Sequence, residues 1–483
     1  MRSGKKEHVA YDDLHEYLEA LENRGELHRV KADVDPLLEI AEITGRVSKS
    51  PEGRALLFER VRGGALPVVT NMFGSWRRMC AALSISGPQE LTRRMEALLG
   101  SSASGTLDND LLAPFFPQCV PSARCREVAD PDAAAIIGSA LKNWPRDGIG
   151  SRWPGGRFLT LPLVFTGDAA GGAFNCGMYR VELFDSGSCG IHWYPGSGGA
   201  GHYRGHAAAG KRMPVAIALG GDPAAMLAAA LPLPEAVDEM AFAGFLRGRP
   251  LDLVPCRDSG LMVPAGSEVV IEGSIEPGET VRGGDFGNHT GFYAPGGEVP
   301  VMRITSVTRR RDAILPATVV GPPPMEDCFM GKAMERLMLP LLRRLLPEIV
   351  EINLPLEGIF HGAAVVSIRK TRAGQGREVI QQVWEGGWLA SSRLLVVVDA
   401  DMDPHDLSLA GWWALNHADW QQDLVIAGEP SAGRSSYGDF GGRLGIDATR
   451  KTPSERAGRP AEEVAPDSSM QETVTRRWRE YGF

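Results

Sequence analysis

An amide and a guanidinium lie close together in the segment Asn175-Cys176-Gly177-Met178-Tyr179-Arg180. The amide oxygen of Asn175 is a suitable ligand for a hard metal ion. The guanidinium of Arg180 presents a planar set of donors that fits a carboxylate or a phosphate. Residues 178–183 alternate in polarity like a half-buried strand. Taken alone, the segment is better explained as a capped turn and a surface arginine, and only features elsewhere in the chain favour a functional site.

Three carboxylates follow a second segment of strand character. Asp399, Asp401 and Asp403 come after the apolar run 394–398, which is typical of a buried strand in a parallel sheet. The C-terminal ends of such strands are a usual place for ligands in open sheets, so these carboxylates could bind a cation. Capping of the following turn and helix is the simpler explanation and the one we favour.

The composition is that of a soluble globular protein. Of the 483 residues, 43% are hydrophobic and 23% are charged, and this length predicts about two to four domains. A net charge of −9 without a sustained basic stripe argues against a nucleic-acid partner. No signal segment or membrane-spanning run is visible, and the seven cysteines are scattered without a C-x-x-C pair. We therefore expect a cytoplasmic protein with reduced thiols and no membrane partner.

Helix and strand patterns divide the chain into four parts. Residues 1–125 predict an α/β domain whose first helix is capped by Asp12 or Asp13. Residues 126–312 predict a barrel or sandwich, because short strand candidates alternate with glycine-rich turns. Residues 313–450 predict a second α/β domain. Predicted helices cover about 14–24, 36–47, 202–209, 223–230, 330–346 and a stretch from 378 onward. Predicted strands cover 27–34, 55–58, 67–70, 157–165, 175–184, 214–218, 268–272, 299–307, 349–354, 363–369 and 394–398.

The last part, residues 451–483, is predicted to be a loose linker followed by a charged helix. Trp478, Tyr481 and Phe483 lie on this helix. An exposed aromatic tail of this kind usually docks on another surface, so we expect it to contact another subunit.

Short motifs follow one another in a fixed order along the chain, at residues 13–18, 175–180, 214–220, 233–235, 261–265, 286–291, 445–449 and 478–483. Together they resemble the UbiD family of decarboxylases over essentially the whole length. The resemblance implies a mixed α/β (α+β) protein with an N-terminal α/β domain, a central split β-barrel that binds a flavin, and a C-terminal α/β domain with a C-terminal helix. It also implies a homodimer or a higher homo-oligomer.

The resemblance implies a cofactor as well as a fold. The family uses prenylated FMN, made by a separate flavin prenyltransferase, to decarboxylate an α,β-unsaturated or aromatic carboxylic acid without oxidation. The phosphate of the flavin (or of plain FMN) is held through Mn²⁺ or Mg²⁺, with K⁺ beside it. The difficult chemistry belongs to the cofactor, whereas the protein orients and protonates.

Family positions can be carried over one by one. Asn175 and Glu239 match the metal ligands, and both supply the hard oxygen atoms that Mn²⁺ or Mg²⁺ prefers. Some members add a histidine ligand, and its position is Gly198 here. Arg443 stands where a lysine commonly meets the cofactor. The implied cofactor-binding residues are Met178, Tyr179, Arg180, His192, Trp193, Tyr194, Ser197, Gly198, Pro232 and Arg443.

The chain departs from the family at the catalytic acids. Active members combine an arginine with two acids in a Glu-Gly-Pro-Phe-Gly-Asp/Glu loop. Here residues 283–288 read Gly-Gly-Asp-Phe-Gly-Asn, so Gly283 and Asn288 replace the acids and only Arg180 remains. Asparagine can donate a hydrogen bond but cannot deliver a proton.

Several explanations of this loss compete. Asp285 is new in this loop and is one candidate proton donor, Glu272 and Glu279 precede it, and His289 is another candidate, although a structural role suits His289 better. Alternatively, the protein does not decarboxylate. It would then be a different flavin- and metal-binding enzyme or an inactive assembly partner of a catalytic paralogue. The catalytic candidates are Arg180, Asp285, Asn288 and His289.

Overall fold

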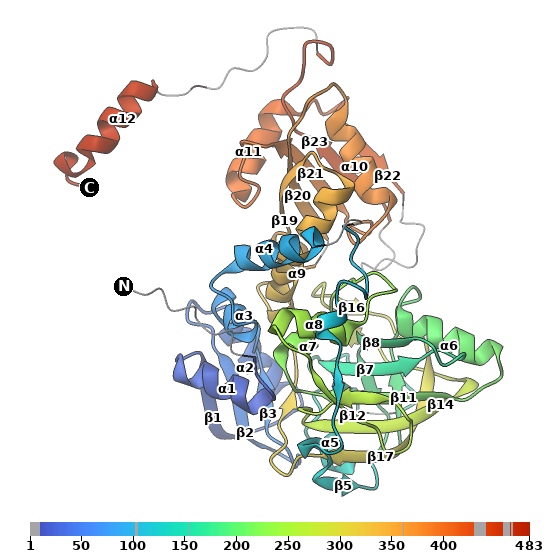
Figure 1. The fold of residues 1–483 in the computed structure, drawn as a ribbon. Helices are drawn as coiled ribbons and strands as arrows, with labels where there is room; N and C mark the ends of the chain where they lie inside the picture. Colours follow the sequence, from blue (N-terminus) through green and yellow to red (C-terminus); the bar gives the residue numbers. More distant parts are fainter. Residues whose placement is uncertain are drawn as a thin grey trace.

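The computed structural model describes residues 10–101, 105–153, 155–360, 362–428, 441–456, 464 and 467–483. Within these residues, helices and strands form three α/β units in sequence, and a C-terminal helix lies apart from them (Figure 1). In the same residues, no helix is long and apolar enough to cross a membrane. The mixed α/β organisation expected from the sequence is confirmed.

The N-terminal unit is a sheet in the order β1-β2-β3-β18 with helices beside it. Strand β18 (Leu315–Pro316) runs parallel to β3, so the chain returns to this sheet after the central unit. The Asp13 carboxylate accepts the N–H of Glu16 at 3.0 Å and caps the first helix, one of the two predicted caps. The elements are α1 (Leu14–Asn23), β1 (Leu27–Val34), α2 (Glu39–Ser48), β2 (Ala55–Val61), β3 (Val68–Thr70), α3 (Trp76–Ala82) and α4 (Pro88–Gly100).

The central unit is an antiparallel sheet that curls into a half-barrel, in the order β6-β9-β10-β17-β14-β11-β7-β8 (Figure 1). Two predicted strands are split in the structure. Residues 157–165 form β6 and the start of β7, and residues 175–184 form β8 and β9. The second break falls at Tyr179 and Arg180, so Arg180 lies in a connection and not within a strand.

Two helices of the central unit begin at positions that matter for the site. Ser197 caps α6 by accepting the N–H of Ala200. Asp238 caps α8 by accepting the N–H groups of Met240 and Ala241, each at 2.8 Å. Glu239 is therefore the first residue of α8, a helix that the sequence did not predict. The elements are β4 (Gln118–Cys119), β5 (Val128–Asp130), α5 (Ala134–Ile137), β6 (Arg157–Leu159), β7 (Pro162–Gly167), β8 (Phe174–Met178), β9 (Val181–Leu183), β10 (Ser188–Ile191), α6 (Gly198–Ala208), β11 (Met213–Leu219), α7 (Pro223–Ala228), α8 (Glu239–Arg247), β12 (Asp252–Pro255), β13 (Met262–Pro264), β14 (Val269–Arg282), β15 (Phe286–Gly287), β16 (Tyr293–Ala294) and β17 (Glu298–Arg309), with 3-10 turns at Ala113–Phe115 and Arg124–Arg126.

The C-terminal unit is a sheet in the order β19-β20-β21-β23-β22, in which β20, β21 and β23 are parallel. The apolar run 394–398 forms the buried middle strand, as predicted. The elements are α9 (Glu326–Leu345), β19 (Ile349–Asn353), a 3-10 turn (Leu356–Gly358), β20 (Ala363–Ile368), α10 (Gln375–Glu385), β21 (Leu394–Asp399), α11 (Leu407–His417), β22 (Leu424–Ala427) and β23 (Arg443–Asp447).

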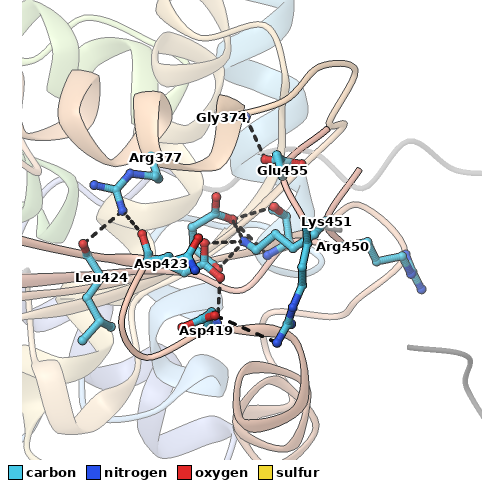
Figure 2. A network of polar contacts seen from close by, with 12 residues as sticks. Gly374, Arg377, Asp419, Asp423, Leu424, Arg450, Lys451 and Glu455 are labelled. Carbon is cyan, nitrogen blue, oxygen red and sulfur yellow. Dashed lines mark hydrogen bonds and ion pairs between the residues drawn. The ribbon is translucent and has the colours of Figure 1, made fainter. Parts of the chain in front are cut away.

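A network of ion pairs holds the segment after β23 against this sheet (Figure 2). The ammonium of Lys451 lies 3.2 Å from a carboxylate oxygen of Asp423 and 3.2 Å from one of Asp447. Glu455 accepts the backbone N–H of Gly374 at 2.8 Å and pairs with Lys370. Residues 450–456 thus belong to the C-terminal unit, whereas most of the predicted linker lies outside the described residues.

The three carboxylates after β21 (Asp399, Asp401 and Asp403) make separate structural contacts. Asp401 forms a two-bonded ion pair with Arg450 at 2.7 and 2.8 Å, and Asp399 accepts the backbone N–H of the same residue at 2.9 Å. Asp403 accepts the N–H of His405 at 2.9 Å and shapes the turn before α11. The described residues contain no cluster of three His, Cys, Asp or Glu side chains suited to a metal ion. The favoured alternative, a local structural role, agrees with these contacts.

The C-terminal helix α12 (Ser468–Arg477) continues into a 3-10 turn (Trp478–Tyr481), and neither contains a buried residue. Trp478 is 51% exposed and Phe483 79% exposed, and their rings stack on each other with centroids 5.1 Å apart. An apolar surface of this kind, held away from its own chain in Figure 1, is typical of a segment that packs on another subunit.

We predict that deleting residues 472–483 lowers the mass of the assembly measured by light scattering. The midpoint of thermal unfolding should stay unchanged, because the deleted residues bury no side chain in the chain that carries them. An unchanged assembly mass would show that the aromatic tail does not hold subunits together.

Candidate active site

A cavity of about 2790 Å³ lies where the central half-barrel meets α9 and the C-terminal unit. Its walls come from the β8–β9 connection, the ends of β10 and β15, the first turns of α6 and α8, one side of α9, and Val383 of α10. Most of the predicted site residues line it, namely Asn175, Met178, Tyr179, Arg180, His192, Trp193, Tyr194, Ser197, Gly198, Pro232, Glu239, Asn288 and His289. Residues from segments far apart in the sequence therefore meet in one cavity.

Arg180 is a half-buried cation of this wall. Its guanidinium carbon lies 4.6 Å from the centre of the Phe286 ring, a cation–π contact. Within the described residues, its guanidinium makes no hydrogen bond and no ion pair shorter than 4.0 Å. Burial lowers the pKa of Arg180 from its usual value, but the group stays charged at any relevant pH. The cavity thus presents a cation that has no anionic partner of its own.

Asn175 and Glu239 form the second polar feature of the cavity. Glu239 accepts the N–H of Cys176, the residue after Asn175, at 3.1 Å, and this bond ties the start of α8 to β8. The Asn175 amide nitrogen donates to the Tyr179 hydroxyl at 3.4 Å, which leaves the amide oxygen for other contacts. Burial raises the pKa of Glu239 to about 7, as expected for a carboxylate without a cation beside it.

Gly198 makes room for the Asn175 amide. A Cβ atom at position 198 would lie 2.0 Å from the Asn175 amide oxygen, so the glycine is required by this side chain. The nearest histidine on the same helix is His202, one turn further along α6, and it also lines the cavity. Its Nδ1 lies 2.9 Å from the Thr166 hydroxyl, which orients the ring. The sequence prediction missed this relation because it began the helix at 202.

The space beside Gly283 is occupied by two other side chains. A Cβ atom there would lie 2.9 Å from His192 and 3.1 Å from the Glu182 carboxylate. Glu182 is buried, accepts the N–H of Gly284 at 2.9 Å and lies 3.2 Å from His192 Nε2. An acid of the neighbouring strand β9, which does not line the cavity, thus takes part of the space that a side chain at position 283 would need.

Asn288 and His289 are bound to each other. The Asn288 amide oxygen accepts both the backbone N–H and the ring Nδ1–H of His289, each at 2.8 Å. The ring nitrogen must be the donor in the second bond, because an amide oxygen carries no proton. The His289 ring also packs edge-on against Phe360, with centroids 5.5 Å apart. These contacts fix the His289 ring as part of the wall.

The structure does not bring Asp285 or Arg443 into the cavity. The Asp285 carboxylate pairs with Arg146 at 3.1 Å and accepts the N–H of Gly296 at 3.0 Å, so it fastens the 283–288 loop from outside. Arg443 donates to the carbonyls of Ala390 and Gly428, at 2.8 and 3.0 Å. The roles expected for Asp285 at the substrate and for Arg443 at the cofactor stay predictions, and neither side chain is among the residues that line the cavity.

The two other carboxylates considered as donors are likewise placed elsewhere. Glu272 accepts the backbone N–H groups of three consecutive residues, 257–259, at 2.7–3.1 Å. Glu279 forms an ion pair with Arg303. Neither residue lines the cavity, so both stabilise the loop and strands that carry them.

One acid of the cavity wall escaped the sequence prediction. Asp327 is the second residue of α9 and lines the cavity. One carboxylate oxygen accepts the N–H of Cys328 at 3.0 Å, whereas the other is buried and has no hydrogen-bond partner. Burial raises the pKa of Asp327 to about 7. Asp327 was missed because α9 was predicted to begin only at 330.

Comparison with known proteins gives close relatives over nearly the full length. An uncharacterized protein of Archaeoglobus fulgidus is 40% identical, over 98% of this chain and 99% of its own. An uncharacterized protein of Aquifex aeolicus is 36% identical, over 92% of this chain and 93% of its own. Both alignments therefore span nearly the whole of each chain.

Two solved structures share the fold. Vanillic acid decarboxylase of Sedimentibacter hydroxybenzoicus in its closed form has a TM-score of 0.85 at 24% identity, covering 98% of this chain and 99% of that one. An evolved dimeric form of the UbiD-class enzyme HmfF from Pelotomaculum thermopropionicum, in complex with prFMN, has a TM-score of 0.79 at 25% identity, covering 95% and 98%.

Three family models match consecutive parts of the chain. They are described as the N-terminal domain, the Rift-related domain and the C-terminal domain of 3-octaprenyl-4-hydroxybenzoate carboxy-lyase, and they match residues 18–98, 122–323 and 328–448. With models, relatives and fold in agreement over nearly all of its length, the chain belongs to the UbiD family.

Proposed function

We propose that this protein is a non-oxidative decarboxylase that uses prenylated FMN to remove CO₂ from an α,β-unsaturated or aromatic carboxylic acid. Members of its family are carboxy-lyases. The observation that carries the proposal is Arg180, a half-buried cation at the cavity wall with no ion pair among the described residues. A guanidinium in this setting favours a ligand carboxylate, which supplies the missing negative charge.

The residues present fit the implied cofactor and metal. Glu239 and Asn175 offer oxygen ligands for Mn²⁺ or Mg²⁺, and the raised pKa of Glu239 reflects a carboxylate that lacks a cation. Trp193 has a buried indole N–H without an acceptor in the described part of the chain, which suits an anionic ligand. In our proposal, the two oxygens hold the flavin phosphate through the metal, with K⁺ nearby, and Met178, Tyr179 and Tyr194 enclose the ring system.

The roles in the reaction then divide between cofactor and protein. The prenylated flavin supplies the electron sink through which CO₂ is lost. Arg180 binds and orients the substrate carboxylate, and the apolar walls exclude water from it. A separate flavin prenyltransferase supplies the cofactor, and the enzyme works as a homodimer or larger homo-oligomer. We place it in the cytoplasm, in keeping with its seven free cysteines. The domain limits at 125, 312 and 450 are part of the same proposal.

The missing acids favour a second candidate. Gly283 carries no side chain, and Asn288 has no proton to give. A flavin- and metal-binding enzyme of the same fold that does not decarboxylate would need neither acid. An inactive assembly partner of a catalytic paralogue would need neither acid nor the cation of Arg180.

Co-expression with a flavin prenyltransferase tests the proposed function. We expect the purified protein to contain prenylated FMN by mass and absorbance, and to release CO₂ from at least one acid among vanillate, 3,4-dihydroxybenzoate and cinnamate. Arg180→Ala should abolish that release. Cofactor binding without CO₂ release would favour the non-decarboxylating enzyme, and no cofactor would favour the assembly partner.

The metal site gives a separate prediction. Glu239→Ala should lower the Mn²⁺ and the flavin content of the purified protein together, because both depend on the same carboxylate. Glu235→Ala is the matched control, since Glu235 is an exposed acid of the same segment and is not a proposed ligand. Metal analysis and flavin absorbance measure the outcome. Full metal and flavin content in Glu239→Ala would contradict the proposed site.

Restoring the first acid should conflict with Glu182. Gly283→Glu adds a Cβ 2.9 Å from His192 and a second carboxylate beside Glu182, so we expect a loss of about 1–3 kcal/mol in unfolding free energy by urea titration. Gly205→Glu, in open space on α6, should cause no such loss. Adding Glu182→Gln to Gly283→Glu should recover part of the loss, because the amide removes the second charge. If the losses of unfolding free energy caused by Gly283→Glu and by Glu182→Gln are strictly additive, the two carboxylates do not compete for this space.

A further inference from the structure

Asp327 combines two features, a carboxylate oxygen without a hydrogen-bond partner and a place on the cavity wall. Asp327 lies in the first turn of α9 and is only 5% exposed. The oxygen that Cys328 N–H does not contact is buried and has no hydrogen-bond partner. An unpaired buried carboxylate oxygen is costly, so its retention on a cavity wall points to a contact made with a ligand.

Neighbouring acids lack this combination. Glu326, directly before Asp327, also has one oxygen without a hydrogen-bond partner, but its other oxygen accepts the N–H of Phe73 at 2.8 Å and the residue does not line the cavity. Asp147 accepts backbone N–H groups of three residues, including Gly287 at 2.8 Å, and is likewise absent from the wall. Among the described residues, Asp327 is the one buried aspartate that shares the cavity wall with both Arg180 and Asn288.

We propose that Asp327 is the proton donor of this enzyme and does the work of the acids lost at positions 283 and 288. The inference rests on the proposed decarboxylase function. The bond from the substrate carbon to its carboxylate breaks, CO₂ leaves, and the electron pair remaining on carbon takes the proton of the Asp327 carboxyl group. Water entering the cavity then returns a proton to the Asp327 carboxylate. The sum is substrate carboxylate plus one proton giving CO₂ and the protonated product.

The electrostatics suit this role. Burial raises the pKa of Asp327 to about 7, so much of it is protonated near neutral pH. The charged and titratable groups around it are Glu326 and Cys328 on α9, and Arg180 across the cavity. Glu326 favours the protonated form of Asp327, whereas Arg180 favours the carboxylate.

Arg180 would also time the proton transfer. While Arg180 is paired with the substrate carboxylate, its charge is balanced and Asp327 holds its proton. When the carboxylate departs as neutral CO₂, the unbalanced cation again favours an ionised Asp327 and so promotes donation. Asn288 cannot do this, because its amide has no acidic proton.

The first experiment separates protonation from bond cleavage in the flavin-loaded protein. We expect Asp327→Asn to lower kcat for CO₂ release by about 10²–10⁴-fold with KM changed by less than about threefold. Exchange of ¹³C-bicarbonate into the carboxyl group of the same acid should continue, because exchange needs cleavage but no protonation. Vanillate, 3,4-dihydroxybenzoate and cinnamate are the probes. Asp327→Glu should recover part of the lost kcat, and Asp252→Asn is the matched control, an acid-to-amide change at an exposed position of β12 outside the cavity.

A kcat for Asp327→Asn within about threefold of the unaltered protein would overturn the inference and leave the proposed function standing. Loss of exchange together with turnover would also overturn it, because Asp327 would then be needed for cleavage or folding. An unaltered protein that neither releases CO₂ nor exchanges bicarbonate with any probe would contradict the proposed function instead.

The second experiment needs no substrate or cofactor. In protein labelled with ¹³C at the aspartate carboxyl carbons, the signal missing from Asp327→Asn identifies Asp327. We expect this signal to titrate with a midpoint near pH 7, within about one unit. A midpoint below pH 5 would overturn the inference, because Asp327 would hold no proton to donate at neutral pH.

Discussion

The site depends on the cation of Arg180, for which the described residues supply no ion pair within 4.0 Å. Removing a charge from water costs several kcal/mol when burial is complete and no counter-ion is present. Arg180 is half-buried, and the Phe286 ring offers only a cation–π contact, worth about 0.5–2 kcal/mol. The charges of Asp147 and Asp327 favour the charged form of Arg180, but neither carboxylate forms an ion pair with it among the described residues. A bound anion would therefore complete the charge balance at this point.

Local backbone structure explains why the guanidinium of Arg180 faces the cavity. The run from 175 to 184 has the alternation of one strand, but the chain breaks it at Tyr179 and Arg180, and the guanidinium faces the cavity from a connection. The two glycines of the site then act in opposite ways. Gly198 leaves space for the amide of Asn175, which lines the cavity together with Glu239. The space at Gly283 is taken by Glu182 and His192, which removes an acid from the wall.

The sequence predicted most elements because their signals are local. Asp13 caps the first helix, and the apolar run before Asp399 forms a buried parallel strand. Helix starts were predicted less well where the signal was weak or had another explanation. Helix α9 follows Met325, whose side chain is no ordinary cap, after a run of prolines, so its first turn was missed and Asp327 with it. At α8, Asp238 is a good cap, but the segment was interpreted only as a ligand motif.

Motif matching selected residues of the central unit that line the cavity, whereas Asp285 and Arg443 find their partners in tertiary contacts elsewhere. Arg443 matches a family position by its neighbours in sequence, and its guanidinium donates to the carbonyls of Ala390 and Gly428. Asp285 lies two residues from one vacated position, yet backbone bonds of its loop to residues 148 and 149 direct its carboxylate to Arg146. Sequence distance predicts neither outcome, because both depend on where the backbone already finds its hydrogen bonds.

In our proposal the proton donor, Asp327, lies on a helix and not in the 283–288 loop. This position changes which effects control its protonation. The first turn of a helix favours a carboxylate, because backbone N–H groups and the helix dipole stabilise negative charge there. Burial acts in the opposite direction on Asp327 and is the larger effect, since its pKa is raised. The cavity wall that carries Asp327 also includes Val383 of the C-terminal unit, whereas Arg180 belongs to the half-barrel. The two groups that we propose to bind and protonate the substrate therefore lie on different structural units, and their alignment depends on how those units are packed together.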